Sequence, residues 1–552
     1  MRAIPWFLVA VIAYVPARAA TLVSGPFLRD VGTDRAVIAF ETDVDTPAAV
    51  EVGQTDAYGT TIASPSAGTW HQVTVEGLPP KSLRHYRVLL DGAPAGRPGT
   101  FITAPSGPEP FTFLVYGDSR SNPDAHALVV ARMAEHPASF FVNTGDLVSN
   151  GSKVEEWKDL LRITSELSGD MPFLATCGNH DLDGDGPPDS FIRYFGPVEP
   201  TEGPGTYRVQ DWAGVRMIYL DRFFAGTVDV ECFMRVQSFE FCFDARQMEW
   251  MKAQLEAART DPAVKHVFIV VHEGPYSSKP DRNGAAELRM QLNDFARSKV
   301  RAILSGHDHL YERGFSGNGI PYVVSGGGGA PLYETTVKEG PTVPPHELVM
   351  AASTYNFQRV RVDGDRIEIN TFDAAGMELE AFEIVPGPAC QAVGDCPPPK
   401  AGWCTGAPEC SIEGRCIWTC EPPPECSDEE TTLCEMRTPV EDCPGAWTCV
   451  QSKCAWACDP PPETVPPDAG TADATEPEPG ETDEGTATPD NPPATDPGTA
   501  TDPGVTTPPE SATPAGKGGG CSTVPAASPS ALPLVLLVLA ALGARFRASR
   551  RR

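Results

Sequence analysis

Five short polar clusters in this chain of 552 residues each follow an apolar run and carry groups that bind metal ions. They supply carboxylate, amide and imidazole side chains from separated points of the sequence. Two divalent metal ions that share a bridging carboxylate need this mixture of ligands, and such a pair clamps a phosphate group while activating water. The clusters therefore predict a dinuclear metal site suited to phosphate-ester hydrolysis. They are Gly117-Asp118, Gly145-Asp146, Gly178-Asn179-His180-Asp181, Val271-His272 and Gly306-His307-Asp308-His309.

The apolar runs before the clusters have the length and composition of strands, and helical segments lie between them. Helices are expected over residues 125–135, 155–167 and 244–258, the last with Asp244 as its N-cap. Alternating strands and helices predict a layered α/β domain. In such domains functional groups collect at the carboxyl ends of the strands, where every cluster falls. Strands are expected over residues 111–116, 139–143, 172–176, 216–220, 267–271 and 302–304.

The order of the five clusters resembles the calcineurin-like metallophosphoesterase superfamily over residues 111–385. The resemblance implies a four-layer α/β metallophosphoesterase domain over residues 110–386, a phosphate-ester substrate and two metal ions. It also implies that His180 stands beside the metals as the acid that protonates the leaving oxygen. The implied ligands are Asp146 as the bridge, Asp118 and His309 for the first metal, and Asn179, His272 and His307 for the second.

The first cluster departs from the family pattern. The family usually has a histidine two residues after the first aspartate, whereas this chain has Arg120. A guanidinium group stays protonated and has no lone pair to offer a metal ion. The first metal then either lacks a ligand or recruits another, for which His126 is the candidate. Alternatively, Arg120 holds the substrate phosphate through a bidentate contact.

A closer resemblance is to the purple acid phosphatases, through residues 272–278 and 306–313 and a fibronectin-like front domain. Those enzymes place a tyrosine three residues after the bridging aspartate to bind ferric iron. Ser149 stands at that position here. The resemblance therefore leaves the metals open among Mn, Fe and Zn, as a divalent or mixed-valence pair.

The start of the chain has the features of an export signal. Arg2 precedes an apolar stretch over residues 4–15 and a small-x-small cleavage site, so residues 1–19 are interpreted as a signal peptide. Residues 20–104 then alternate apolar and polar positions in short runs, which predicts an all-β sandwich. Within them, residues 77–88 resemble the late part of a fibronectin type III-like domain.

Twelve of the 16 cysteines lie in two similar runs within residues 389–458. Each run closes with a C-x3-C pair, which predicts two repeats of about three disulfides each. Zinc knuckles are the alternative, but the even number of cysteines, the lack of histidine and the expected export argue against them. Cys232 and Cys242 are expected to form a further disulfide, and Cys177 is expected to be a buried thiol.

Residues 459–517 are rich in Pro, Thr, Gly, Asp and Glu and are predicted to be a disordered linker. Residues 518–552 combine a Gly-Cys motif, an apolar run over residues 531–544 and an arginine-rich end. This layout resembles the sorting tails of myxobacteria, with a plain membrane anchor as the alternative. Together with the signal peptide it predicts an exported protein, held at the cell surface or outer envelope or released to the medium.

The net charge of −31 is partly due to the acidic linker, and no basic stripe indicates a nucleic-acid-binding surface. Among enzymes, nucleotide or cyclic-nucleotide hydrolysis is an alternative function. From another class, a surface-binding protein with a decayed phosphatase domain is the alternative. The acidic residues that follow His180 predict a flexible loop rather than a calcium site, because the twelfth position lacks a glutamate. The sequence does not indicate an oligomeric state.

Overall fold

The computed structural model describes residues 19–184, 186–198, 203–224, 243–279, 282, 284–335, 346–400, 408–420, 445–450 and 453–458. The expected signal peptide up to residue 18, the linker and the C-terminal tail lie outside these residues, and so do Cys232 and Cys242. No helix within the described ranges has the length and apolar character needed to cross a membrane.

The N-terminal region is a sandwich of two antiparallel sheets, as the alternation of apolar and polar residues predicts. In β3, for example, Ala48, Val50 and Val52 are buried while the residues between them are half-buried. One sheet has the order β1 (Leu22–Val31), β2 (Ala36–Thr42), β5 (Trp70–Val75). The other has the order β4 (Thr60–Ala63), β3 (Ala48–Gly53), β6 (Leu83–Leu90), β7 (Ala93–Ile102).

The central domain contains two mixed sheets that pack face to face. Phe113 and Phe268 meet between the sheets, edge to face, with ring centroids 5.5 Å apart. The six-stranded sheet has the order β10 (Phe173–Ala175), β9 (Phe141–Asn143), β8 (Phe111–Tyr116), β18 (Asn356–Asp363), β19 (Arg366–Asp373), β20 (Glu378–Ile384). The seven-stranded sheet has the order β11 (Arg208–Trp212), β12 (Val215–Leu220), β13 (His266–Glu273), β14 (Val300–Gly306), β16 (Pro321–Ser325), β15 (Tyr311–Ser316), β17 (His346–Ala352).

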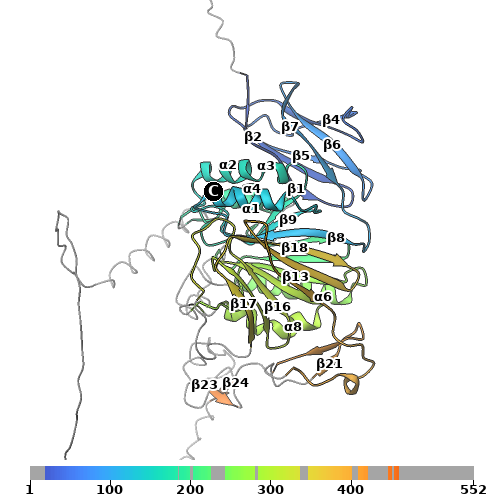
Figure 1. Cartoon of the computed structure of the whole chain (residues 1–552), viewed down its shortest axis with the longest axis vertical. Coiled ribbons are helices and arrows are strands. Elements are labelled where there is room, and N and C mark those ends of the chain that lie inside the picture. The colour runs from blue at the N-terminus through green and yellow to red at the C-terminus, as the bar shows by residue number, and fades with distance from the viewer. Residues whose placement is uncertain are drawn as a thin grey trace, which may run out of the picture. The chain divides into compact units, whose positions relative to one another are not determined.

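Helices cover the outer face of each sheet and complete the expected four layers (Figure 1). The strands are buried on both faces, because alternate residues such as Phe113 and Leu114 point into the two different cores. Asp244 caps helix α6 as predicted, with its side chain accepting the N–H of Arg246. The six-stranded sheet is covered by α1 (Pro123–Met133), α2 (Val154–Ile163), α3 (Ser165–Ser168) and α4 (Asp189–Phe195), and the seven-stranded sheet by α6 (Ala245–Thr260), α7 (Ala286–Met290) and α8 (Leu292–Arg297).

The sandwich contacts the central domain through specific polar bonds. The hydroxyl of Tyr86 donates to the carbonyl of Gly169 at 2.8 Å. The buried carboxylate of Glu41 accepts from Arg193 at 2.7 Å and from Tyr194 at 3.1 Å. Since buried charges are costly unless they are paired, these bonds fix the sandwich against α4 and the end of α3.

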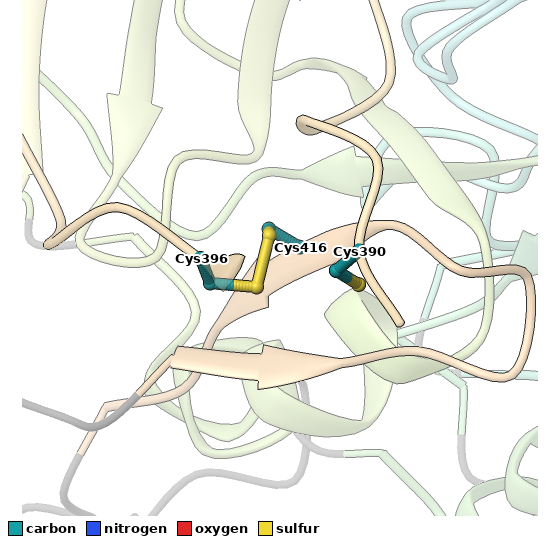
Figure 2. Close-up of side chains that lie close together, drawn as sticks. All are labelled: Cys390, Cys396 and Cys416. Atoms are coloured by element: carbon teal, nitrogen blue, oxygen red, sulfur yellow. A yellow bond between two sulfur atoms is a disulfide. The ribbon is translucent and has the colours of Figure 1, made fainter. Parts of the chain in front are cut away.

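The first cysteine repeat is a hairpin of β21 (Pro408–Cys410) and β22 (Cys416–Trp418), preceded by the short helix η1 (Val393–Asp395). Disulfides join Cys390 to Cys410 and Cys396 to Cys416. Figure 2 shows the bond between Cys396 and Cys416, with Cys390 beside it. These sulfur atoms are bonded to each other and are therefore not zinc ligands, which confirms the disulfide interpretation for this repeat.

The same repeat is attached to the central domain. Arg297 of α8 forms an ion pair with Glu409 at 2.6 Å, and the side chain of Asn293 accepts the N–H of Cys420 at 2.8 Å. The second repeat contributes another antiparallel hairpin, β23 (Gly445–Val450) and β24 (Lys453–Cys458). Among the described residues, Cys177 is a free cysteine and is buried, as predicted.

Candidate metal centre

The strands bring the five polar clusters to one edge of the two sheets. β8, β9 and β10 run parallel in one sheet, and β13 and β14 run parallel in the other. Their carboxyl ends therefore point the same way within each sheet, which places the residues that follow them together. Asp118 follows β8, Asp146 follows β9, Asn179 and His180 follow β10, His272 lies near the end of β13, and His307 and His309 follow β14.

Three of the predicted ligands have a left-handed backbone. The φ angle is 56° at Asp118, 55° at Asp146 and 70° at His307. Residues other than glycine rarely adopt this conformation, and where they do the surrounding structure must hold them there. The turns after β8, β9 and β14 are therefore built to aim particular side chains.

The glycines of the clusters make room for ligands from other clusters. A Cβ atom at Gly306 would lie 2.4 Å from Oδ2 of Asp118, and one at Gly178 would lie 2.4 Å from Oδ1 of Asp146. In the last cluster His307 itself takes the left-handed conformation, while Gly306 provides space for the Asp118 carboxylate.

His272 stands between the two aspartates. Its Nε2 atom lies 3.3 Å from Oδ1 of Asp146 and 4.0 Å from Oδ1 of Asp118. Its Nδ1 atom lies 2.8 Å from the carbonyl oxygen of Thr144, which can only accept, so Nδ1 carries a proton. In the neutral ring Nε2 then presents a lone pair to two carboxylates. That arrangement requires a positive charge between them, either a proton on Nε2 or a metal ion.

His307 and His309 follow β14, which lies in the same sheet as His272, and they complete the cluster. Nδ1 of His307 lies 3.3 Å from Nε2 of His272. Nε2 of His309 lies 3.5 Å from Oδ1 of Asp118. Ligand atoms of Asp118, Asp146 and His309 all lie within 4.8 Å of one another, which makes them a candidate metal-binding group.

The surroundings of two oxygen atoms indicate whether these residues suit a metal ion. Oδ1 of Asp118 and Oδ1 of Asn179 are buried and have no hydrogen-bond partner among the described residues. Leaving such an atom unpaired costs about 1–3 kcal/mol, and more for a charged group. A bound metal ion would satisfy both. The donor set of carboxylate, amide and imidazole atoms therefore fits the metals expected from the sequence.

Charge and burial shift the pKa values of Asp118 and Asp146 in opposite directions. Burial raises the pKa of Asp118 well above its usual value, against the charge of His272. Burial acts in the same direction on Asp146, but the charge of His272 and its hydrogen bond lower the pKa of Asp146 overall. Burial lowers the pKa of an imidazole, yet the two carboxylates raise that of His272 to about 9. The two carboxylates thus favour a protonated imidazole at His272, and a metal ion that bound Nε2 would displace this proton.

His180 lies beside the cluster with one ring nitrogen occupied. Its backbone N–H donates to Oδ1 of Asp146 at 2.9 Å, and its Nδ1 lies 3.1 Å from the carbonyl of Ser149. The carbonyl can only accept, so Nδ1 carries a proton in this contact. The side chain is half-buried. His180 is thus held to Asp146 through its backbone N–H, while its ring contacts the carbonyl of Ser149.

Arg120 lies inside the cluster. Its Nε donates to Oδ2 of Asp146 at 3.0 Å, and its Nη2 donates to Nε2 of His309 at 3.2 Å. Only 13% of its side chain is exposed. The guanidinium group therefore contacts two of the residues expected to bind the first metal.

The structure does not bring His126 to the metal ligands. Its buried ring stacks on Tyr116, with centroids 5.7 Å apart, and its Nε2 lies 3.3 Å from the Tyr116 hydroxyl. Burial lowers the pKa of His126 to about 3, so the ring is neutral near neutral pH. It lines a pocket of about 200 Å³ that Arg120 also lines. This placement favours a packing role for His126 over the replacement ligand considered from the sequence.

Asp181 has a role that the sequence pattern did not reveal. It is fully buried, and its carboxylate accepts the backbone N–H groups of Asp146, Leu147, Val148 and Gly178. The expected flexible acidic loop is therefore wrong at this residue. An aspartate directly after a predicted metal ligand and the predicted acid, with no metal of its own to bind, was the available signal.

Tyr333 and Arg282 also contribute to the site, although they lie outside the sequence motifs. The ring of Tyr333 stacks on His309 with centroids 4.1 Å apart. Arg282 donates to the carbonyl of His307 at 3.0 Å and to Asp308 at 2.7 Å. Both residues orient the segment that carries the last two histidines. They come from loops whose sequences carry no recognisable pattern.

Two central sheets are covered by helices and deliver carboxylate, amide and imidazole groups to one edge. This is the architecture of a metallophosphoesterase. Residues 111–311 match the family model described as calcineurin-like phosphoesterase, so this part of the chain is a calcineurin-like metallophosphoesterase domain. The family binds a dinuclear metal centre. Residues 19–105 match a family model described as a domain of unknown function, DUF7800.

Similar proteins include named phosphatases. The rat serine/threonine-protein phosphatase CPPED1 is 27% identical over 215 residues, which is 36% of this chain and 61% of the relative. Purple acid phosphatase 21 of Arabidopsis thaliana is 25% identical over 257 residues, which is 45% of this chain and 54% of the relative. The chain thus spans about half the length of the curated relatives it matches.

A solved structure shares the fold. Purple acid phosphatase PPD1 from yellow lupin (Lupinus luteus) seeds superposes with a TM-score of 0.53 at 16% identity, covering 65% of this chain and 74% of its own. At this identity the likeness concerns the fold. It agrees with the expected order of an all-β region followed by a metallophosphoesterase domain.

Proposed function

We propose that this protein hydrolyses phosphate esters with the help of metal ions held at the candidate centre. The observation that carries the proposal is the convergence of Asp118, Asp146, Asn179, His272 and His307, with two buried oxygen atoms left for a cation. The family match and the phosphatases among the relatives support the same reaction class.

When bound, metal ions would polarise the phosphoryl oxygens and lower the pKa of an attacking water molecule. The residues of the chain would supply orientation and a proton. Asp146 is held by the backbone N–H of His180 and by Arg120, so its carboxylate has a fixed direction. His180 would donate the proton on Nε2 to the leaving oxygen, because the proton on Nδ1 is held by the carbonyl of Ser149.

We also propose that the protein is exported and retained at the cell surface. The apolar stretch and small-x-small site within residues 1–19 support export, and the tripartite tail at residues 518–552 supports retention. The two disulfides of the first cysteine repeat agree with an oxidising compartment.

The test of the reaction uses the purified full chain with 4-nitrophenyl phosphate and bis(4-nitrophenyl) phosphate. Chelation should abolish turnover, and adding back Mn, Fe or Zn ions should restore it. Asn179→Ala should lower both metal content and activity, while Asn370→Ala, an amide change in β19, should lower neither. Full metal content with no turnover of either ester would favour the surface-binding alternative, and turnover that survives complete metal removal would overturn the proposal.

A further inference from the structure

The two oxygens of the Asp146 carboxylate have different partners. Oδ1 faces Nε2 of His272 at 3.3 Å, whereas Oδ2 accepts the Nε–H of Arg120 at 3.0 Å. A carboxylate that bridges two metal ions must present itself to both. In this chain one of its two sides is turned to a guanidinium group instead.

We infer that Arg120 takes the place of one metal ion, so that the chain holds a single ion on the His272 side of Asp146. The inference rests on the proposed metal-dependent function and changes the number of ions that the site holds. It assigns to Arg120 a role that is neither that of a metal ligand nor solely that of a phosphate clamp.

The side chain of His309 can offer a metal ion only one nitrogen lone pair. Nδ1 of His309 donates to the carbonyl of Pro331 at 2.8 Å, which leaves Nε2 without a proton in the neutral ring. That lone pair accepts the Nη2–H of Arg120 at 3.2 Å. A single lone pair cannot accept this hydrogen bond and bind a metal ion at the same time. The contact with Arg120 therefore excludes His309 as a ligand.

The charge of Arg120 suits this position. Its guanidinium stays protonated and lies against Asp146, whose side chain is 1% exposed. The guanidinium therefore gives this buried carboxylate the positive charge that a metal ion would otherwise supply. Arg120 donates single N–H groups to Asp146, His309 and Ser121. Of the five N–H groups of an arginine side chain, two then remain for the oxygens of a phosphoryl group.

The opposite side of Asp146 retains a complete set of donors for one ion. Nε2 of His272 lies 3.3 Å from Oδ1 of Asp146 and 3.3 Å from Nδ1 of His307. Ligand atoms around a tetrahedral ion with bonds of ~2.1 Å lie ~3.4 Å apart, which matches this spacing. Oδ1 of Asn179 is buried without a hydrogen-bond partner, and the inference assigns it to this ion as the fourth donor.

Metal stoichiometry tests the inference without depending on turnover. The purified full chain, stripped of metal and reloaded with Mn²⁺, should bind one equivalent and give the electron paramagnetic resonance spectrum of an isolated ion. Arg120→His restores the residue that the family usually carries at this position. It should bind two equivalents and give the spectrum of an exchange-coupled pair. Arg361→His, an exposed change in β18, should bind one equivalent like the wild type.

The outcomes separate this inference from the proposed function. Two equivalents in an active wild-type protein would overturn the inference and leave the function standing. No bound metal together with no hydrolysis would overturn both. One equivalent in the wild type and also in a folded Arg120→His variant, checked by circular dichroism, would show that Arg120 does not exclude the second ion, and the inference would fall.

Discussion

Oδ2 of Asp181 accepts the backbone N–H of Asp146 at 3.0 Å, so one buried aspartate fixes the backbone of the other. The same carboxylate accepts three further backbone N–H groups, from Leu147, Val148 and Gly178. Each oxygen thus receives two donors. The turn that carries Asp146 is tied to the turn that carries Asn179 and His180, and this link joins two of the five clusters.

Replacing Asp181 should weaken both the fold and metal binding. In Asp181→Asn an amide NH₂ group would face two N–H donors and leave them unpaired, at a cost of ~3 kcal/mol in the free energy of unfolding. Urea unfolding and metal analysis would measure the two losses. Asp183→Asn, a change of the same kind in the same loop, is the control. Equal stability of the two variants would show that the four hydrogen bonds contribute little.

Removing the proposed acid should slow the reaction according to the leaving group. His180→Ala should lower kcat by ~10²–10⁴-fold for an alkyl phosphate, whose leaving oxygen needs a proton. The loss should be much smaller for 4-nitrophenyl phosphate, because nitrophenolate leaves without one. Metal content should stay at the wild-type level, since the backbone N–H of His180 still binds Asp146. An equal loss for both substrates would exclude His180 as the acid.

His126→Ala should leave metal stoichiometry unchanged, because the ring of His126 bonds to Tyr116 and not to the ligand cluster. The variant should nevertheless unfold more easily, by ~1–3 kcal/mol, since a buried ring leaves a cavity beside β8. Metal analysis and thermal unfolding of the same preparations would check both statements. A drop of one metal equivalent would restore His126 as a ligand.

Glu312 should make stability depend on pH. Burial raises the pKa of this carboxyl from 4.5 to about 7, against its hydrogen bonds with Ser278 and Tyr322. The protonated form is therefore favoured in the folded state. Its contribution to stability is complete below pH 4.5 and is lost as the pH rises through 7, by about 3 kcal/mol in total.

Glu312→Gln removes this titration while keeping the shape of the side chain. The stability of the variant relative to the wild type should therefore rise between pH 5 and about pH 8. Urea unfolding at several pH values would measure the difference. Glu368→Gln, a half-buried change in β19, should show no such trend. A constant difference between Glu312→Gln and the wild type across this range would contradict the raised pKa.

The sequence by itself determined the fold class and the ligand types. The strand-like runs, the glycine–aspartate pairs and the two late histidines are local patterns, and β8 begins and ends at the residues expected for it. These features are recognisable because strands buried on both faces form continuous apolar runs, and the polar residues that follow them emerge at a sheet edge.

Only the tertiary structure decided the parts played by Arg120, His126 and Asp181. Each of them lies within a predicted motif or a few residues from one, yet its function depends on which distant atoms it meets. Arg120 contacts His309, 189 residues further along the chain, while the ring of His126 turns toward Tyr116. Such contacts arise from the packing of two sheets and their turns, and sequence spacing carries no information about them.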